Sequence, residues 1–226
     1  MPYLVNMCPK EIDALKEDTP LFIPFGTVEY HGSQLPIGAD ILFVDGLMRE
    51  LDKKSRILIA PTVTCCPNGN IVSGPDKYTI DTSANLFQEY CYEMIKGYSA
   101  AGFRHIILLV YHQAANIEFL LRAVLMRIEY EQKNNLGNGW WTANKNPSTP
   151  WIEIERAFLD TTEFSAHGGL PETEAVLSVA PETVHKEYIG ENEAHWNAGA
   201  EKADKAHGDE VFSRIVDKWV AKCPKK

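Results

Sequence analysis

The apolar residues of the chain form short continuous stretches that alternate with longer stretches of helical spacing. The continuous stretches cover residues 21–28, 56–64 and 105–111. They are rich in β-branched and aromatic residues, and their length predicts buried strands. The last of them, His-Ile-Ile-Leu-Leu-Val-Tyr, is the clearest strand in the sequence.

Three further stretches have the periodicity of amphipathic helices. They span residues 40–54, a stretch that ends at Ala101, and residues 116–132. The first has apolar residues at Leu42, Val44, Leu47, Met48 and Leu51. Thr82 or Ser83 is a suitable N-cap for the second helix, and Gly102 is a suitable residue to end it. A final helical stretch covers residues 192–222, with a break expected near Gly208.

The alternation of strands and helices predicts an α/β fold. Helices of this length between strands imply crossover connections, and therefore a mostly parallel sheet covered on both faces. Loops are expected at residues 66–81, 134–150 and 160–171, and the second contains two tryptophans that could cover a substrate or form a subunit contact. No linker or repeat divides the sequence, so residues 1–226 are expected to form one domain.

The composition of the 226 residues narrows the class of protein. A net charge of −9 argues against a general nucleic-acid binder, which needs clustered Lys and Arg. The sequence shows neither a signal peptide nor an apolar run long enough to span a membrane, so no membrane partner is expected. The five cysteines are odd in number and lack zinc-ribbon spacing, which favours a reducing cytoplasm.

Ionisable residues follow the first predicted strand. Glu29 and His31 lie just beyond it, and Asp40 stands where the next helix begins. In open parallel sheets, ligands bind beyond the carboxyl ends of the strands. Two carboxylates and an imidazole suit zinc, manganese or iron. Taken singly, an Asp at the start of a helix, such as Asp40, is more often an N-cap than a metal ligand.

Two other places carry residues of the same type. His112 follows the strand at 105–111 directly, so it is expected near the same end of the sheet. The segment His-Gly-Gly-Leu-Pro-Glu places His167 five residues before Glu172 at the start of a helix. Here His167 is expected to carry a proton, and Glu172 to bind a metal or act in acid–base catalysis. Helix capping is the alternative role for Glu172.

Together these segments resemble the motifs of the creatininase (creatinine amidohydrolase) family. The first motif is Gly-Thr-Val-Glu-Tyr-His-Gly at residues 26–32, followed by Leu35-Pro36 and Asp40. Tyr-His-Gln-Ala-Ala-Asn at residues 111–116 is similar to the second motif, and His-Gly-Gly-Leu-Pro-Glu-Thr at residues 167–173 to the third. All three occur in the family's order, and the similarity extends over roughly residues 21–181.

The resemblance implies a three-layer α/β/α fold, a divalent metal centre with one or two ions of Zn, Mn or Fe, and assembly into a homo-oligomer such as a hexamer. It implies that Glu29, His112 and Asp40 hold one ion, and that His31 and the shared Asp40 hold a second. Members of the family hydrolyse C–N bonds of cyclic or linear amides. Others cleave peptides, or open the ring of oxidised inositols at a C–C bond.

The chain also departs from the family pattern. Creatininase supplies a Glu two residues after the His of the second motif, where this chain has Ala114, and Glu172 is the candidate substitute. Gln34 stands in place of a common His, and Glu163 in place of a Trp that covers the substrate. These departures predict a small-molecule substrate other than creatinine.

Metal-assisted hydrolysis is the predicted reaction. A metal lowers the pKa of bound water from about 15.7 toward 7, and the hydroxide attacks a carbonyl or amidine carbon of a small polar, cyclic substrate. His167 or Glu172 then protonates the leaving group. Three alternatives stay open: C–C ring opening of an oxidised inositol, a non-catalytic metal-binding or interface homologue, and a hydrolase with Cys65 or Cys66 as nucleophile.

Overall fold

A parallel sheet of four strands forms the centre of the computed structural model. The structure describes residues 2–68, 78–112, 115–134, 151–159, 163–164, 167–190 and 197–226. Within these residues the strands run in the spatial order β2-β1-β3-β4, every pair parallel. Their bounds are β1 Leu21–Phe25, β2 Leu58–Ile59, β3 His105–Val110 and β4 Trp151–Arg156.

Side chains of the two central strands point alternately to the two faces of the sheet. On β1, Leu21, Ile23 and Phe25 join one apolar cluster while Phe22 joins the other. On β3 the same alternation separates Ile106, Leu108 and Val110 from Ile107 and Leu109. Both faces of the sheet are therefore buried, which explains why these strands have no polar position between their apolar ones.

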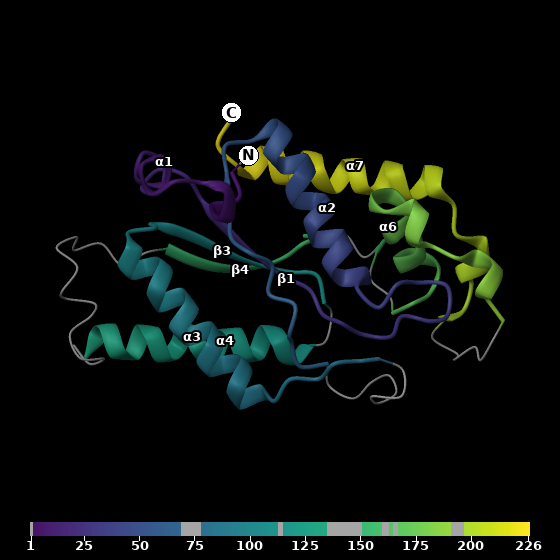
Figure 1. Cartoon of the computed structure of the whole chain (residues 1–226), viewed down its shortest axis with the longest axis horizontal. Coiled ribbons are helices and arrows are strands. Elements are labelled where there is room, and N and C mark those ends of the chain that lie inside the picture. Colours follow the sequence, from purple (N-terminus) through teal and green to yellow (C-terminus); the bar gives the residue numbers. More distant parts are fainter. Residues whose placement is uncertain are drawn as a thin grey trace.

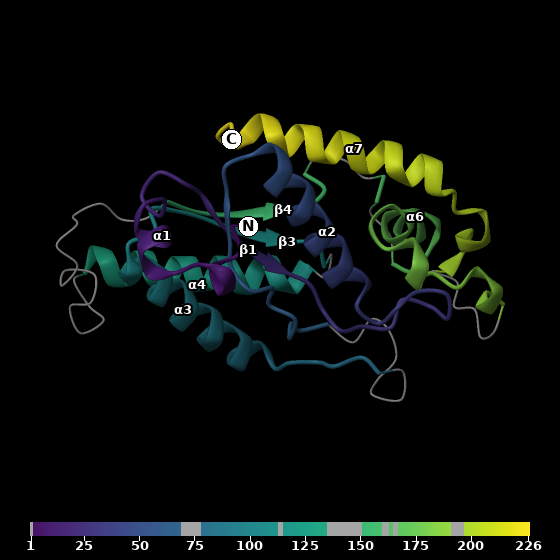
Figure 2. The same cartoon turned by 45° about the horizontal axis from the view of Figure 1, so that its top comes forward.

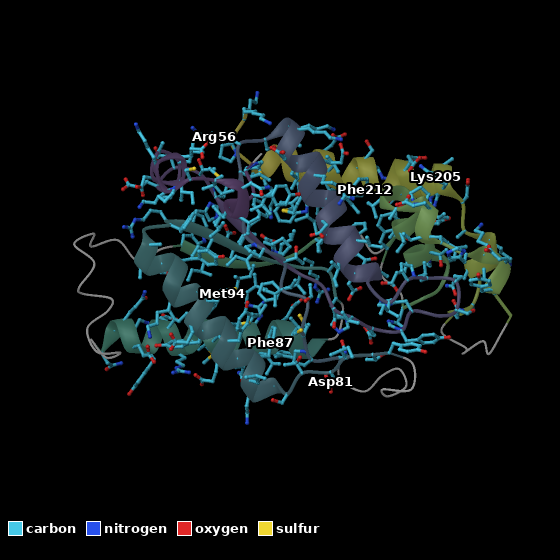
Figure 3. All side chains as sticks on the ribbon, in the orientation of Figure 1. Arg56, Asp81, Phe87, Met94, Lys205 and Phe212 are labelled. Carbon is cyan, nitrogen blue, oxygen red and sulfur yellow. The ribbon has the colours of Figure 1, made fainter. Side chains whose placement is uncertain are left out.

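Helices cover both of these faces (Figures 1 and 2). On one side lie α2 (Ala39–Lys54), α6 (Leu170–Val179) and α7 (Lys205–Lys222), and on the other lie α3 (Ala84–Ala101) and α4 (Ala115–Lys133). Figure 3 shows Phe212 of α7 and Phe87 of α3 on these opposite sides. The predicted α/β fold with three layers and a parallel sheet is confirmed.

Short helices complete the described part of the chain. They are α1 Pro9–Asp13, η1 Leu4–Asn6, η3 Pro181–Thr183, η4 Lys186–Tyr188 and η6 Ala200–Lys202. In the described residues no helix is both long and apolar enough to cross a membrane. The expectation of a single domain over residues 1–226 stays a prediction.

Most predicted elements occur close to their expected positions. α3 begins after Ser83, whose hydroxyl accepts a hydrogen bond from Leu86 N at 3.4 Å, and ends at Gly102 in the left-handed conformation. Two predicted strands are shorter than expected, because β1 ends at Phe25 and β2 holds only two residues. β4 was not predicted at all, since its alternating Trp-Ile-Glu-Ile-Glu-Arg pattern is that of a half-exposed edge strand.

The predicted break near Gly208 is wrong. α7 runs through this position, and its N-cap is Asp204, whose side chain accepts from Ala206 N. A Cβ at Gly208 would lie 2.4 Å from the carbonyl oxygen of Glu174. The glycine therefore allows α6 and α7 to pack closely, and it does not end a helix. The predicted loop at 134–150, with Trp140 and Trp141, lies almost wholly outside the described residues.

Candidate metal centre

The sheet brings the first and second sequence motifs together at one edge. β1 and β3 are adjacent and parallel, so the segments that follow them leave the sheet side by side. Glu29 and His31 lie in the segment after β1, and His112 lies two residues beyond β3. Asp40 joins them from the first turn of α2. A Cβ at Gly26 would lie 2.8 Å from Ile41 N, so this glycine lets α2 approach the end of β1.

Backbone and side-chain hydrogen bonds hold the segment after β1 on both sides. Glu29 N donates to Ile37 O at 2.9 Å, which closes the loop that leads to α2. On the other side Ile80 N donates to Val28 O at 2.9 Å, and Tyr30 N donates to Thr79 Oγ1 at 3.0 Å. The carboxylate and imidazole of the first motif thus project from a fixed backbone.

Asp40 lies between the two histidines and presents one oxygen to each. Its Oδ2 accepts a hydrogen bond from His112 Nδ1 at 2.9 Å, and its Oδ1 lies 3.3 Å from His31 Nε2. Asp40 is 1% exposed. A carboxylate with its two oxygens directed to different imidazoles has the arrangement of a group that bridges two cation sites.

Glu29 and His112 form one side of this arrangement. Glu29 Oε2 lies 3.2 Å from His112 Nδ1, but that nitrogen gives its hydrogen bond to Asp40. Among the described residues Glu29 Oε2 and His112 Nε2 are buried without a hydrogen-bond partner. A buried carboxylate oxygen without a partner is costly, and a cation would satisfy it.

His31 and Glu172 form the other side. His31 Nδ1 donates to the carbonyl of Glu29 at 2.9 Å, because a carbonyl oxygen can only accept. This fixes the ring so that Nε2 faces Glu172 Oε1 at 3.5 Å as well as Asp40. Metal-binding histidines commonly have their second nitrogen held in this way by a backbone carbonyl.

Glu172 is held by the turn that precedes α6. Gly168 N donates to Glu172 Oε2 at 2.5 Å, which leaves Oε1 on the side of His31. The carboxylate therefore accepts a hydrogen bond from the backbone next to the N-terminus of α6, and it also lies in the buried cluster. Its residue is 2% exposed.

His167 stacks against the cluster. Its ring lies 4.5 Å from the ring of His31 with an interplanar angle of 30°. His167 Nε2 donates to Tyr30 O at 2.9 Å, so Nδ1 carries the lone pair of the neutral ring. Burial first, and then the neighbouring charge of His31, lower the pKa of His167 below its ordinary value of 6.5.

Buried carboxylates raise the pKa of His31 and His112, the two histidines that face Asp40. Burial lowers the pKa of His31, but Glu172, Asp40 and Glu29 outweigh it and raise this pKa to about 10. For His112 burial acts in the same direction and is outweighed by Asp40 and Glu29, which raise its pKa to about 9. Protons therefore compensate the carboxylates in the metal-free protein.

The pKa values of Asp40 and Glu172 shift in opposite directions. Burial raises the pKa of Asp40, but the imidazoles of His31 and His112 outweigh it and lower this pKa. Burial and the negative charge of Asp40 raise the pKa of Glu172 to about 7, against the opposing effect of His31. A set of three buried carboxylates and two imidazoles that needs protons to balance its charge fits divalent cations, which would take the place of those protons.

The structure therefore brings all six residues expected at the site into one cluster. In the described part of the chain, three groups have ligand atoms within 4.8 Å of one another, namely Glu29 with Asp40 and His112, His31 with Asp40 and Glu172, and Glu29 with His31 and His167. The first two groups share Asp40. Ala114 lies outside the described residues, and Glu172 stands in the second group, where its role as substitute ligand was expected.

Sequence reasoning missed a buried polar network beside the cluster. Gln34 and Thr173 are 0% exposed and Asn197 is 4% exposed. Gln34 Nε2 lies within hydrogen-bond distance of Asn197 Oδ1, Thr173 Oγ1 and Gly168 O. The sequence marked Gln34 only as an amide in place of a histidine that is common in the family motif, and it gave no sign that this amide is buried against Asn197.

The cysteine alternative is not supported by the geometry. Cys66 is buried and its thiol donates to Gly26 O at 3.3 Å. Burial raises the pKa of this thiol well above its ordinary value, which disfavours the thiolate. Cys65 is exposed and belongs to none of the residue groups described above.

Solved structures of creatininase are similar to this chain in fold. A mutant of creatininase with Phe in place of Trp is 15% identical, with a TM-score of 0.76 over 98% of this chain and 97% of that one. The structure described as "Creatininase Mn" is 14% identical, with a TM-score of 0.74 over 98% and 96%. A Glu-to-Gln creatininase mutant complexed with creatine is 15% identical, with a TM-score of 0.72 over 97% and 96%.

At these identities the solved structures show a shared fold. A comparison with curated protein sequences finds no match. The family model described as "Creatininase: Creatinine amidohydrolase" matches residues 6–223. The chain therefore belongs to the creatininase family, whose members are metal-dependent amidohydrolases.

Proposed function

We propose that the protein hydrolyses a C–N bond in a small polar, cyclic amide and uses two divalent ions that share Asp40. The observation that carries this proposal is the placement of the two Asp40 oxygens, one toward His112 and one toward His31. Zinc, manganese and iron all suit a set of imidazoles and carboxylates. Among the similar structures, one is a manganese form of creatininase and another is a mutant of the Zn-Zn type.

Each ligand-capable residue has a distinct place in this proposal. Glu29 and His112 would hold one ion with Asp40, and His31 and Glu172 would hold the other. Ions bound there would supply Lewis-acid polarisation of a carbonyl group and would acidify water. Glu172 Oε2 stays with Gly168 N, so this side chain would bind through Oε1.

His167 is the residue that we assign to proton transfer. Its lowered pKa keeps the ring neutral near pH 7, and the bond from Nε2 to Tyr30 O fixes its tautomer. A neutral imidazole beside the ion sites can accept a proton and return it to the leaving amine. Because Glu172 already faces His31, the proton-transfer role falls to His167 rather than to Glu172.

The remaining expectations are parts of the same proposal. All five cysteines are free thiols, which supports a reducing compartment such as the cytoplasm. Assembly into a homo-oligomer such as a hexamer follows from the family and is tested by light scattering. Departures from the family motifs at Gln34 and Glu163 support a substrate other than creatinine.

A metal-reconstituted hydrolysis screen tests the function. Protein stripped with a chelator and reloaded with Zn²⁺ or Mn²⁺ would be assayed on creatinine, other lactams, linear amides and cyclic ketones. The expected result is amide hydrolysis that disappears with the chelator and returns with the metal. Metal-loaded protein that turns over only the cyclic ketones would favour C–C cleavage, and tight metal binding without any turnover would favour a non-catalytic homologue.

A further inference from the structure

Two buried amide side chains meet beside the second ion site. Gln34 Nε2 donates to Asn197 Oδ1 at 2.9 Å, and Asn197 Nδ2 donates to Gln34 Oε1 at 3.1 Å. Each amide is thus both donor and acceptor to the other, across 163 positions of sequence. We call these two side chains the amide pair.

The orientation of the amide pair is fixed by a third partner. Gly168 O lies 2.6 Å from Gln34 Nε2, and a carbonyl oxygen can only accept a hydrogen bond. The NH₂ group of Gln34 must therefore face Gly168, and its oxygen must face the NH₂ group of Asn197. Reversing either amide would place two acceptors or two donors against each other.

The amide pair connects directly to a proposed metal ligand. Gln34 Nε2 donates to the carbonyl oxygen of Gly168, and the N–H of Gly168 donates to Glu172 Oε2. Glu172 Oε1 then faces His31 Nε2. The position of Gly168 therefore determines which carboxylate oxygen is directed toward the ion site.

The segment of the first motif is shaped to receive the amide pair. Gly32 has a φ of +95°, and a Cβ there would lie 2.5 Å from Gln34 Oε1 and 2.9 Å from Asn197 Nδ2. The pair thus packs directly on the glycine that follows His31. Gln34 also accepts at its own carbonyl from His185 N at 2.9 Å, which fixes its backbone.

We infer that Gln34 and Asn197 are positioning residues that hold Gly168 so that Glu172 Oε1 stays directed at His31. Among the described residues, the hydrogen bonds of these two side chains go to Gly168, Thr173 and each other, so their effect should be confined to one side of the site. The inference rests on the proposed function only where it treats Glu172 as a ligand. Partners of this kind around metal ligands typically change metal affinity by about 10- to 100-fold.

Gln34→Met and Asn197→Leu test this inference. Each keeps a side chain of similar size and removes the polar contacts, and Ile128→Val in α4 is the matched control for a general loss of stability. Two quantities would be measured in the full-length protein: amide hydrogen exchange over residues 167–173, and Zn²⁺ affinity by competition with a chromophoric chelator.

The expected result has two parts. Exchange over residues 167–173 should become at least about 10-fold faster in both variants and stay unchanged in Ile128→Val. One Zn²⁺ should bind about 10- to 100-fold more weakly, while the other stays within about 3-fold of the wild type. The double variant should be no worse than the more affected single variant, because both substitutions break the same contacts.

Unchanged exchange over residues 167–173 in both variants would overturn the inference, whether or not the protein binds metal. Equal weakening of both Zn²⁺ sites would also overturn it, because it would show a general structural effect. Wild-type protein that binds no Zn²⁺ would refute the proposed function, and the exchange measurement would then still decide whether the amide pair holds this segment.

Discussion

The two sides of Asp40 are built in different ways. On the side of Glu29 and His112, the ligand-capable residues follow adjacent parallel strands within a few positions. On the side of His31 and Glu172, one residue lies in a loop and the other on α6, 141 positions later by their numbers. The first side is therefore fixed by the sheet itself, and the second depends on long-range polar contacts.

This difference predicts that substitutions will separate the two sides. Substitution of Asp40 should weaken Zn²⁺ binding at both ion sites. Substitution of Glu172 should weaken binding only at the site beside His31, and substitution of Gly32 should weaken binding at that same site to a smaller extent. The stiffness of the sheet protects the side of His112. The side of His31 depends instead on hydrogen bonds between distant segments, among them those of Gln34, Asn197 and Gly168.

The largest effect is expected from Asp40→Ala. Loss of the shared carboxylate should remove both tight Zn²⁺ sites and lower the hydrolysis rate by at least about 1000-fold, equivalent to about 4 kcal/mol in the barrier. Metal analysis and the hydrolysis screen would measure this, and circular dichroism would check that the variant is folded. Full activity in a folded Asp40→Ala protein would refute the bridging role.

A one-sided effect is expected from Glu172→Gln. The amide keeps the shape of the carboxylate but removes its charge, so the ion beside His31 should bind at least about 100-fold more weakly. This loss exceeds the one expected when a residue that only positions a metal ligand is replaced. The ion beside His112 should remain. Zinc titration with a competing chelator measures both affinities, and His112→Gln is the matched variant that should produce the reverse pattern. Identical patterns in the two variants would contradict the division of the site.

The next largest effect is expected in the pH dependence of folding stability of the metal-free protein. The raised pKa values of His31 and His112, about 10 and about 9, exceed the 6.5 of an ordinary histidine. Each protonated ring therefore stabilises the folded state fully below pH 6.5, and this stabilisation is lost as the pH rises through the folded-state values.

With a chelator present, the melting temperature should consequently fall between about pH 7 and pH 10, and saturating Zn²⁺ should reduce the fall because ions replace the protons. Asp40→Asn is the control, since it removes a carboxylate that raises both pKa values. A metal-free protein that grows more stable over this pH range would contradict the charge balance described for the site.

The smallest effect is expected from Gly32→Ala. The added methyl group would meet Gln34 and Asn197, so it should weaken the ion beside His31 by about 10-fold and leave the other unchanged. Gly97→Ala is the matched control, because a Cβ there meets nothing within 4 Å and the residue lies inside α3. That control should raise stability by roughly 0.5–1 kcal/mol without changing Zn²⁺ binding. Equal Zn²⁺ binding in both variants would argue against a role for the amide pair.

Local pattern predicted much of this molecule. Apolar runs placed β1 and β3, and the hydroxyl and glycine at the ends of α3 predicted its bounds. The position of His112 directly after an apolar strand was enough to expect it near Glu29, because the ends of parallel strands share one edge of the sheet.

What the sequence did not reveal depends on contacts between distant segments. Gln34 and Asn197 are ordinary polar residues until the fold buries them against each other. Gly208 was expected to break a helix, because the closeness of α6 that requires a glycine is not visible in the local sequence. β4 alternates apolar residues with half-buried glutamates, so it lacks the continuous apolar pattern of the inner strands.

Anomalous diffraction from crystals grown with Zn²⁺ would locate each ion relative to Asp40 and so decide whether this carboxylate is shared. We expect two peaks, one between Asp40 and His112 and the other between Asp40 and His31. A single peak, or two peaks of which neither lies beside Asp40, would contradict this expectation.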